Sequence, residues 1–282
     1  MSPRVSVVVP AYQNAAYVEA TLDSVLAQTY PDFELVVADH ASTDGTWDLL
    51  QRYTADPRVR LLRTPAGGGA KANWDRVSQA ATGELVKLLP GDDLLYPTAL
   101  ERQVAALDAA GPGATVVACR RDLVDGRGRP FWRARGLAGL SGVVAGRDAL
   151  RSAVRSGTNP LGEPGCVLLR RDVLERTGWW DDEVPYYIDL ATYARSLLEG
   201  DLVALDATLA AFRVNAGQWS VRLARQQADQ AAAFATKMRA TAPDVVRPED
   251  VRVGNARARL AAAQRRAAYA VLGPRLRAAA RP

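Results

Sequence analysis

The sequence predicts an α/β fold: a Rossmann-like, mostly parallel β-sheet with helices on both faces, followed by a C-terminal helical extension. Three observations support this prediction. Short apolar runs such as Val5–Val9 alternate along the chain with segments of helical spacing. Repeated strand-then-helix order is typical of a mostly parallel sheet with helices on both faces. After Gly217 the composition changes to Ala, Arg and Gln, which favours helices.

The elements of the first 119 residues follow from these runs and from the turn residues that end them. Gly83, for example, follows a helical segment and is expected to cap its end. The expected strands are Arg4–Val9, Phe33–Ala38, Val59–Leu62, Leu85–Leu89 and Thr115–Cys119. The expected helices are Ala15–Gln28, the segment after Thr46, Ala70–Ala81 and Pro97–Ala110.

The second half of the chain is less regular. Residues 120–160 are rich in Gly and Arg, and a loop of that length inside a compact domain is usually functional or mobile. The expected strands beyond it are Gly165–Leu169, Leu202–Leu205 and Ala210–Val214, and the expected helices are Arg171–Thr177, Asp189–Leu198, Ser220–Thr241 and Glu249–Leu272. We therefore expect a first domain at 1–217 and a helical extension at 218–282.

Composition excludes several classes of protein. No apolar stretch approaches the roughly 18 residues of a membrane span, and the N-terminus shows no signal-peptide pattern, so a cytoplasmic protein is expected. Cys119 and Cys166 each lie in an apolar segment and read as buried thiols rather than a disulfide. With His40 as the single histidine, neither a His-rich metal site nor a Ser-His triad is easily built.

The net charge of +5 is unevenly distributed. From Val221 onward there are 13 Lys and Arg against 4 Asp and Glu, so the preceding part is mildly acidic. A basic tail can meet an anionic membrane surface, for instance peripherally at the inner face, or a nucleic acid or an acidic partner. Its arginines alternate with alanines and form no solid block, which favours a solvated helix face and argues against nucleic-acid binding.

The pair Asp92-Asp93 constrains function most. It follows the apolar run Leu85–Leu89 and a Pro-Gly break. Ligands of open α/β sheets bind outside the carboxyl ends of the strands, and adjacent carboxylates there suit a hard divalent cation whose shell is completed by substrate phosphates. The alternative is a solvated turn at the start of a helix, where acids are favoured by the helix dipole.

The usual phosphate-binding loops are absent. The loop Pro10–Asn14 after the first strand has neither G-x-G-x-x-G nor G-x-x-x-x-G-K-[ST], and Gly67-Gly68-Gly69 fits neither pattern. Hydride transfer and phosphoryl transfer are therefore disfavoured. If a nucleotide binds, its phosphates must be held by a metal and by scattered donors.

Several segments, in this order, resemble motifs of the family 2 glycosyltransferases, which are inverting nucleotide-sugar enzymes of the GT-A fold. The resemblance covers residue 4 to about residue 220. It rests on Val5–Asn14, on Phe33–Thr46, on the helix that contains Asn73 with Ala80, Ala81 and Gly83, on Asp92-Asp93, on Gly178–Asp181, on Asp189 with Arg195, and on Phe212–Asn215. The chain departs from the family pattern at Pro90, Ile188, Ala191, Asn215 and His40.

The resemblance implies inverting transfer of a sugar from a UDP- or TDP-type donor to an acceptor hydroxyl, with Mg²⁺ or Mn²⁺ on the diphosphate. Asp93 would be the direct metal ligand, and Asp92 would touch the ribose or a metal-bound water. Asp189 would be the general base; alternatively, it is a helix N-terminal acid that only complements the dipole. The implied nucleotide-binding residues are Pro10, Ala11, Tyr12, Asn14, Asp39, Lys71 and Asp92.

The acceptor side is less defined. A glycan, a lipid-linked molecule or a natural product would fit the resemblance, with Glu163, Trp179 and Trp180 as candidates for contact with acceptor or donor sugar. For the two tryptophans, a position in the protein core is at least as well supported as contact with a sugar. Trp219 and the helices beyond it would cover the acceptor side or form a homodimer contact. One alternative is a catalytically silent nucleotide-sugar-binding protein on the same fold. Another is a nucleotidyltransferase, but the Gly- and Arg-rich signature that such an enzyme normally shows after the first strand is absent here.

Overall fold

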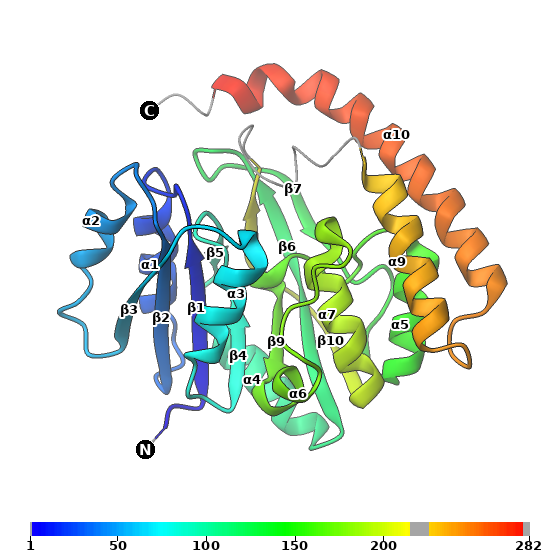
Figure 1. The fold of residues 1–282 in the computed structure, drawn as a ribbon, viewed down its shortest axis with the longest axis horizontal. Helices are drawn as coiled ribbons and strands as arrows, with labels where there is room; N and C mark the ends of the chain where they lie inside the picture. The colour runs from blue at the N-terminus through cyan, green and yellow to red at the C-terminus, as the bar shows by residue number, and fades with distance from the viewer. Residues whose placement is uncertain (1, 215–225, 279–282) are drawn as a thin grey trace.

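The computed structural model describes residues 2–214 and 226–278, with side chains as far as residue 265. Its strands are β1 (Val5–Ala11), β2 (Phe33–His40), β3 (Val59–Thr64), β4 (Leu85–Leu88), β5 (Leu94–Leu95), β6 (Ala114–Val124), β7 (Pro130–Arg135), β8 (Gly142–Val144), β9 (Val167–Arg170) and β10 (Asp201–Arg213). In this part of the chain they form one sheet in the order β3-β2-β1-β4-β9-β6-β10-β5, with β7 beside β6 and β8 beside β10 (Figure 1).

Helices lie on both faces of the sheet. In the view of Figure 1, α3 and α7 lie in front of the strands, while α1 and α4 lie behind them. The helices are α1 (Val18–Leu26), α2 (Thr46–Gln51), α3 (Gly69–Gln79), α4 (Ala99–Ala110), α5 (Gly146–Ser156), α6 (Arg171–Arg176), α7 (Ile188–Glu199), α9 (Gln227–Thr241) and α10 (Pro248–Ala278), with the short turns η1 (Pro164–Cys166) and η2 (Pro185–Tyr187). The predicted α/β sheet with helices on both faces is confirmed.

The first half of the sheet is parallel, as the alternation of strands and helices predicts. β1 pairs in parallel with β2 and β4, and β2 with β3. The register places Ala11 opposite Asp39, so the ends of β1 and β2 lie side by side. All of β1 is buried, as expected of a strand between two helical layers.

The second half of the sheet is mixed. β9 pairs antiparallel with both β4 and β6, whereas β10 is parallel to β6. The predicted strand Gly165–Leu169 is shifted, because Pro164–Cys166 forms a 3-10 turn and pairing begins only at Val167. Leu202–Leu205 and Ala210–Val214 were expected as two strands. They belong to one long strand, β10, whose pairing with β6 shifts register around Thr208.

The prediction of an irregular segment over 120–160 is wrong. This stretch contains the end of β6, then β7, β8 and α5. β7 and β8 pair antiparallel with β6 and β10 and expose most of their residues, so they lack the apolar runs that identified the other strands. The apolar face of α5 is regular, with Ala149, Leu150, Ala153 and Val154 buried, but glycines and arginines around it conceal the pattern.

The C-terminal helices pack on the body of the protein. α10 passes Gly157 so closely that a Cβ there would lie 2.4 Å from Gly254 O, and Figure 1 shows α10 running back alongside α9, on the side of the molecule where α5 lies. α9 begins at Gln227 within the described residues, and α10 runs beyond the predicted end at Leu272. The proposed boundary at 217/218 falls outside the described residues. None of the helices in residues 2–214 and 226–278 has the length and hydropathy needed to span a membrane.

Candidate active site

Three chain segments meet at the carboxyl edge of the parallel strands. β1 ends at Ala11, β2 ends with Asp39 and His40, and the loop after β4 carries Asp92 and Asp93. Leu89 N–H donates to Val8 O at 2.9 Å and extends the pairing of β4 with β1 up to that loop. The edge where open α/β sheets bind ligands therefore brings together the residues predicted for nucleotide and metal.

The loop after β1 is shaped by Asn14. Its side-chain Oδ1 accepts a hydrogen bond of 2.8 Å from Tyr12 N, and its own N–H donates to Thr46 Oγ1 at 2.9 Å. A Cβ at Gly91 would lie 2.7 Å from Asn14 Oδ1, so glycine lets the acidic loop approach the loop after β1. The Tyr12 ring is 57% exposed and stands edge-on to His40, with ring centroids 6.0 Å apart.

Asp39 is completely buried, with one oxygen unsatisfied. Oδ2 accepts a hydrogen bond of 3.3 Å from Ser42 N and lies 3.9 Å from Arg63 Nε. Oδ1 has no hydrogen-bond partner among the described residues. A buried acceptor without a partner is costly, so this atom is suited to a hydrogen bond from a ligand.

The other predicted residues of this edge have protein partners. Lys71 forms an ion pair one helical turn away with Asp75. His40, which stands where the family pattern has an Asp, is buried with Nδ1 3.1 Å from Thr64 Oγ1. Asn73 in α3 lies beneath the edge, and its Nδ2 is 3.3 Å from Ala38 O and 3.5 Å from Ala11 O. Asn73 therefore ties the helix to the ends of β1 and β2.

Arg213 fixes the acidic pair in place. Its backbone N–H donates to Asp93 Oδ1 at 2.9 Å, and its Nε donates to Asp92 O at 2.8 Å. Its Nη1 reaches Gly126 O at 2.9 Å, and the guanidinium lies 4.7 Å from the centre of the Tyr17 ring. Arg213 is buried, so its role is to hold this loop in position, and it does not face a ligand.

The carboxylates of this loop are crowded. Burial raises the pKa of Asp93 well above its usual range, and the neighbouring charges of Asp92 and Glu163 raise it further, against the hydrogen bond from Arg213. Residues 2–214 and 226–278 contain no group of three or more His, Cys, Asp and Glu side chains that could hold a metal by itself. The donor set fits a hard cation held by one or two carboxylates, with substrate phosphates completing the shell.

Asp189 lies in the first turn of α7. Its Oδ2 accepts a hydrogen bond of 2.8 Å from Asn159 Nδ2, and its Oδ1 accepts one of 2.7 Å from Leu190 N. The residue as a whole is partly exposed, and burial of its carboxylate raises the pKa of Asp189 to about 7. Ile188 and Ala191, two departures from the family pattern, are buried and pack into the core.

Glu163 connects the two acidic centres. Its negative charge contributes to raising the pKa of both Asp93 and Asp189, so all three carboxylates belong to one electrostatic neighbourhood. Glu163 is itself paired with Arg121, whose Nη2 donates to Oε1 at 2.9 Å. Asp93 and Asp189 therefore do not lie on opposite sides of the molecule.

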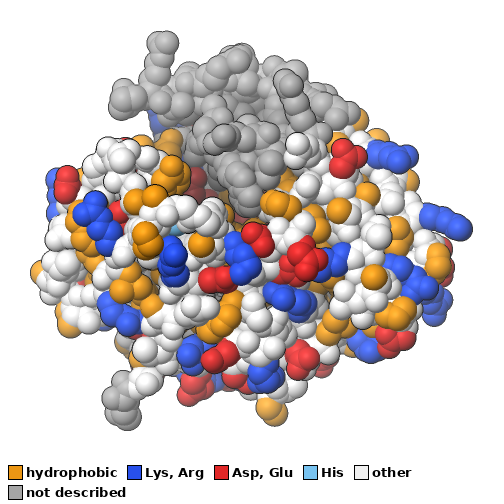
Figure 2. Space-filling model, in the orientation of Figure 1, with side chains coloured by type: hydrophobic (Ala, Val, Ile, Leu, Met, Phe, Trp, Pro, Cys, Tyr) orange, Lys and Arg blue, Asp and Glu red, His pale blue; other side chains and the backbone are white. Residues whose placement is uncertain are grey.

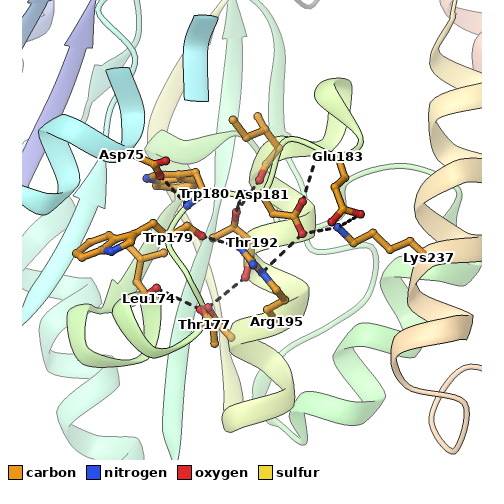
Figure 3. Close-up of polar contacts among 12 residues, drawn as sticks. Asp75, Leu174, Thr177, Trp179, Trp180, Asp181, Glu183, Thr192, Arg195 and Lys237 are labelled. Carbon is orange, nitrogen blue, oxygen red and sulfur yellow. Dashed lines mark hydrogen bonds and ion pairs between the residues drawn. The ribbon is translucent and has the colours of Figure 1, made fainter. Parts of the chain in front are cut away.

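The two tryptophans have different environments (Figure 3). Trp180 is 1% exposed, donates from Nε1 to Ser78 Oγ at 2.9 Å, and stands edge-on to Trp74, so we withdraw it as an acceptor contact. Trp179 has a left-handed backbone, with φ of 62°, and its ring is half-buried. Next to them, buried Asp181 accepts a hydrogen bond of 2.6 Å from Lys237 Nζ of α9.

Two residues of the site had not been identified from the sequence. Asn159, which holds Asp189, lies in the stretch expected to be irregular, and its only local signal is the turn sequence Asn-Pro-x-Gly. Arg121, which holds Glu163, is 42 positions away from it, and no local signal predicts their contact. Asn215 and Trp219 lie outside the described residues.

The sequence matches known proteins over most of its length. The profile of glycosyl transferase family 2 matches residues 6–178. TuaG of Bacillus subtilis (strain 168), named for teichuronic acid biosynthesis, is 37% identical over 103 residues, which are 36% of this chain and 41% of TuaG. The uncharacterized protein MT1568 of Mycobacterium tuberculosis (strain CDC 1551 / Oshkosh) is 27% identical over 228 residues, 78% of this chain and 70% of MT1568. The alignments thus span about two fifths of TuaG and of the B. subtilis protein EpsE.

Solved structures share the fold. The mannosyltransferase PcManGT of Pyrobaculum calidifontis superposes with a TM-score of 0.65 at 24% identity, covering 96% of this chain and 76% of PcManGT. The S. aureus protein TarS (residues 1–349) superposes with a TM-score of 0.67 at 19% identity, covering 85% of this chain and 67% of TarS. The family profile covers well over half of the sequence, and the chain therefore belongs to glycosyl transferase family 2.

Proposed function

We propose that this chain is an inverting glycosyltransferase that moves a sugar from a UDP- or TDP-type nucleotide sugar to an acceptor hydroxyl. The observation that carries the proposal is the shared influence of Glu163 on Asp93 and Asp189. This shared influence supports assigning a carboxylate for the donor diphosphate and a carboxylate for proton transfer to one site. Inverting transfer needs these two functions on opposite sides of the anomeric carbon.

The donor nucleotide is assigned to the edge of β1 and β2. Asp39 Oδ1, buried and without a partner, would accept a hydrogen bond from the base edge of uracil or thymine. Tyr12 would lie against the base, and Pro10, Ala11 and Asn14 would line the loop around it. Lys71 would contribute only after exchanging its ion pair with Asp75 for a phosphate or the base.

The acidic loop is assigned to the diphosphate. Asp93 would hold a Mg²⁺ or Mn²⁺ ion, and Asp92 would contact the ribose or a water on that ion. A divalent ion there supplies Lewis-acid stabilisation of the charge that develops on the leaving diphosphate. Support comes from the crowding of Asp92, Asp93 and Glu163 and from the structural neighbour PcManGT, which was crystallised with GDP-Man and Mn²⁺.

Asp189 is assigned the role of general base. It would take the proton of the acceptor hydroxyl as that oxygen attacks the anomeric carbon and the diphosphate departs from the opposite face. Its pKa of about 7 suits a base at neutral pH. Glu163 and Trp179 would line the sugar or acceptor side. Residues 1–217 would form the catalytic domain, and 218–282 the extension beside the acceptor side.

The acceptor remains a class: a glycan, a lipid-linked molecule or a natural product. Cytoplasmic location, contact of the basic extension with a membrane surface, and a homodimer all stay proposals. The extension carries arginines together with acidic partners, as in the pair Arg247 and Glu249. Figure 2 shows Lys and Arg interspersed with Asp and Glu over the face drawn. No nucleic-acid partner is proposed.

The test is a titration of UDP, TDP and, for comparison, GDP with and without Mn²⁺, followed by a turnover assay with the matching nucleotide sugars. We expect metal-dependent binding of UDP or TDP, slow release of free sugar even without an acceptor, and inversion at the anomeric centre in the proton NMR spectrum of the product. Retention of configuration would contradict the mechanism. Metal-dependent binding without turnover on a broad acceptor panel would favour a catalytically silent binding protein.

A further inference from the structure

A polar cavity lies between α5 and α10, lined by residues other than those of the acidic loop. Its volume is about 440 Å³, within the range of small-molecule sites. It is lined by Arg151, Arg155 and Arg257, by Ser152 and Ser156, and by Ala138 and Asp148. Figure 2 shows Lys and Arg gathered with some Asp and Glu at the right-hand edge, where Figure 1 draws α5, α9 and α10.

The arginines of α5 are held in fixed positions. Arg151 and Arg155 are one helical turn apart and share a single acceptor, Asp250 of α10. Arg151 Nε lies 2.8 Å from Asp250 Oδ2, and Arg155 Nη1 lies 2.6 Å from Asp250 Oδ1. The Asp250 side chain is completely buried and holds both guanidinium groups, and both arginines line the cavity.

The third arginine comes from the facing helix. Arg257 Nη1 donates to the neutral carbonyl Arg155 O at 3.2 Å, and Arg257 forms no ion pair with a carboxylate among the described residues. Asp148 lines the cavity, and Asp250 pairs with two of the lining arginines. Glu249 lies 3.8 Å from Arg247. Three guanidinium groups thus face two carboxylates, and the cavity keeps a net positive charge.

We propose that this cavity between α5 and α10 binds a phosphate group, either of a soluble phosphate ester or of a lipid headgroup. Guanidinium groups present several N–H donors in a planar fork that matches phosphate oxygens, which is why arginine predominates at such sites. The hydroxyl of Ser152 adds a further donor among the lining side chains. Prior fixing of Arg151 and Arg155 by Asp250 lowers the ordering cost of binding.

The wall of the cavity is close in the chain to Asn159, the residue that holds the proposed base. Ser156 in its wall is three residues before Asn159, which holds Asp189, so their Cα atoms are at most about 11 Å apart. A phosphate-bearing molecule bound here would lie beside the loop that orients the base. Binding itself does not depend on sugar transfer, so it is testable even if the proposed reaction is wrong.

The experiment compares Arg257→Gln with Arg259→Gln in the full chain. Arg259 lies two positions further along α10, which places it on the opposite side of the helix, and it does not line the cavity. The probe is glycerol 3-phosphate, measured by calorimetry with glycerol as the uncharged reference. We expect saturable binding that weakens about tenfold in Arg257→Gln and is unchanged in Arg259→Gln.

A parallel arm uses vesicles of phosphatidylcholine with and without phosphatidylglycerol. Binding to the phosphatidylglycerol vesicles that falls in Arg257→Gln, but not in Arg259→Gln, identifies a lipid headgroup as a source of the phosphate. If Arg257→Gln weakens the binding of glycerol 3-phosphate but not the binding to vesicles, the source of the phosphate is a soluble phosphate ester. The proposal is overturned if neither probe binds saturably, or if both variants lose affinity equally, because the charge of α10 as a whole would then explain the binding.

Discussion

Asn159 Nδ2 donates a hydrogen bond of 2.8 Å to Asp189 Oδ2 and so joins the loop after α5 to the proposed base. The same amide donates to Gly162 O at 2.9 Å, while its Oδ1 accepts from the N–H groups of Leu161 and Gly162. A donor to a carboxylate favours the charged form and lowers the pKa. One side chain therefore orients the base and opposes the effect of burial on its protonation.

The rate of sugar transfer should depend on the protonation of Asp189. Burial raises its pKa to about 7, and only the deprotonated form accepts a proton, so kcat/KM should rise with pH through a midpoint near 7. Asn159→Ala removes a hydrogen bond that favours the carboxylate, and the midpoint should move upward by roughly one unit. An unchanged or lower midpoint in Asn159→Ala would show that Asn159 stabilises only the conformation of its own loop and does not influence the pKa of Asp189.

The raised pKa of Asp189 also affects stability, and here the expected trend with pH is a fall, whereas kcat/KM is expected to rise. Because the folded pKa of about 7 lies above the ordinary aspartate value of 3.8, the folded state binds more protons than the unfolded state between these pH values. The free energy of unfolding should therefore fall as pH rises from about 4 to about 7. In Asp189→Asn this loss disappears, and at pH 8 the variant should be more stable by on the order of 2 kcal/mol. This is less than the full pKa shift would give, because Asp189 is partly exposed and solvent screens its charge.

Urea unfolding of both proteins at pH 5 and pH 8 measures this effect. The stabilisation by Asp189→Asn should be larger at pH 8 than at pH 5. Asp172→Asn, which alters an exposed carboxylate of α6, serves as the control and should show no such difference. A stabilisation equal at both pH values would mean that Asp189 titrates normally.

Gly91→Ala should weaken metal-dependent nucleotide binding. The added Cβ would lie 2.7 Å from Asn14 Oδ1, so the loop carrying Asp92 and Asp93 must move. Such overpacking costs about 1–3 kcal/mol, and we expect roughly tenfold weaker binding of UDP with Mn²⁺. In Gly113→Ala, where the added Cβ would meet no atom within 4 Å, affinity should stay at the wild-type value. Equal affinity in both variants would refute the role of this close approach.

Lys237 should anchor the extension to the segment before the base. Its Nζ lies 2.6 Å from Asp181 Oδ2 and 2.8 Å from Glu183 Oε2 (Figure 3), and Asp181 is buried. Lys237→Ala leaves a buried carboxylate with less compensation and should lower the unfolding free energy by about 2 kcal/mol. Glu183→Gln removes the exposed partner and should cost under about 0.5 kcal/mol. Similar losses in both variants would argue against an anchor at Asp181.

The local pattern of apolar residues in the sequence was sufficient to predict the parallel half of the sheet. The runs Val5–Val9 and Leu85–Leu89 are apolar except at Ser6 and Lys87, because their strands are buried on both faces. The acidic pair follows the second run after a Pro-Gly break. β7 and β8 escaped prediction because they are short and mostly exposed at the margin of the sheet. Their positions are determined by pairing with β6 and β10, which no local pattern encodes.

The polar contacts of the site were not predictable for the same reason. Asn159 meets Asp189 across 30 positions, and Arg213 meets the Asp92 carbonyl across 121 positions. Nor does the sequence say which of two adjacent tryptophans turns inward. A left-handed backbone at Trp179 directs Trp180 into the core, and residue type alone does not indicate that conformation.

Turnover by Asp189→Asn tests the central claim most directly. Asparagine keeps the shape of the side chain but cannot take up a proton, so sugar transfer should fall by about 10²–10⁴-fold, while the affinity for UDP with Mn²⁺ stays within a few-fold of the wild type. Single-turnover measurements beside Asp172→Asn separate chemistry from binding. Transfer at the wild-type rate in Asp189→Asn would contradict the account, because the acceptor proton would then have another destination.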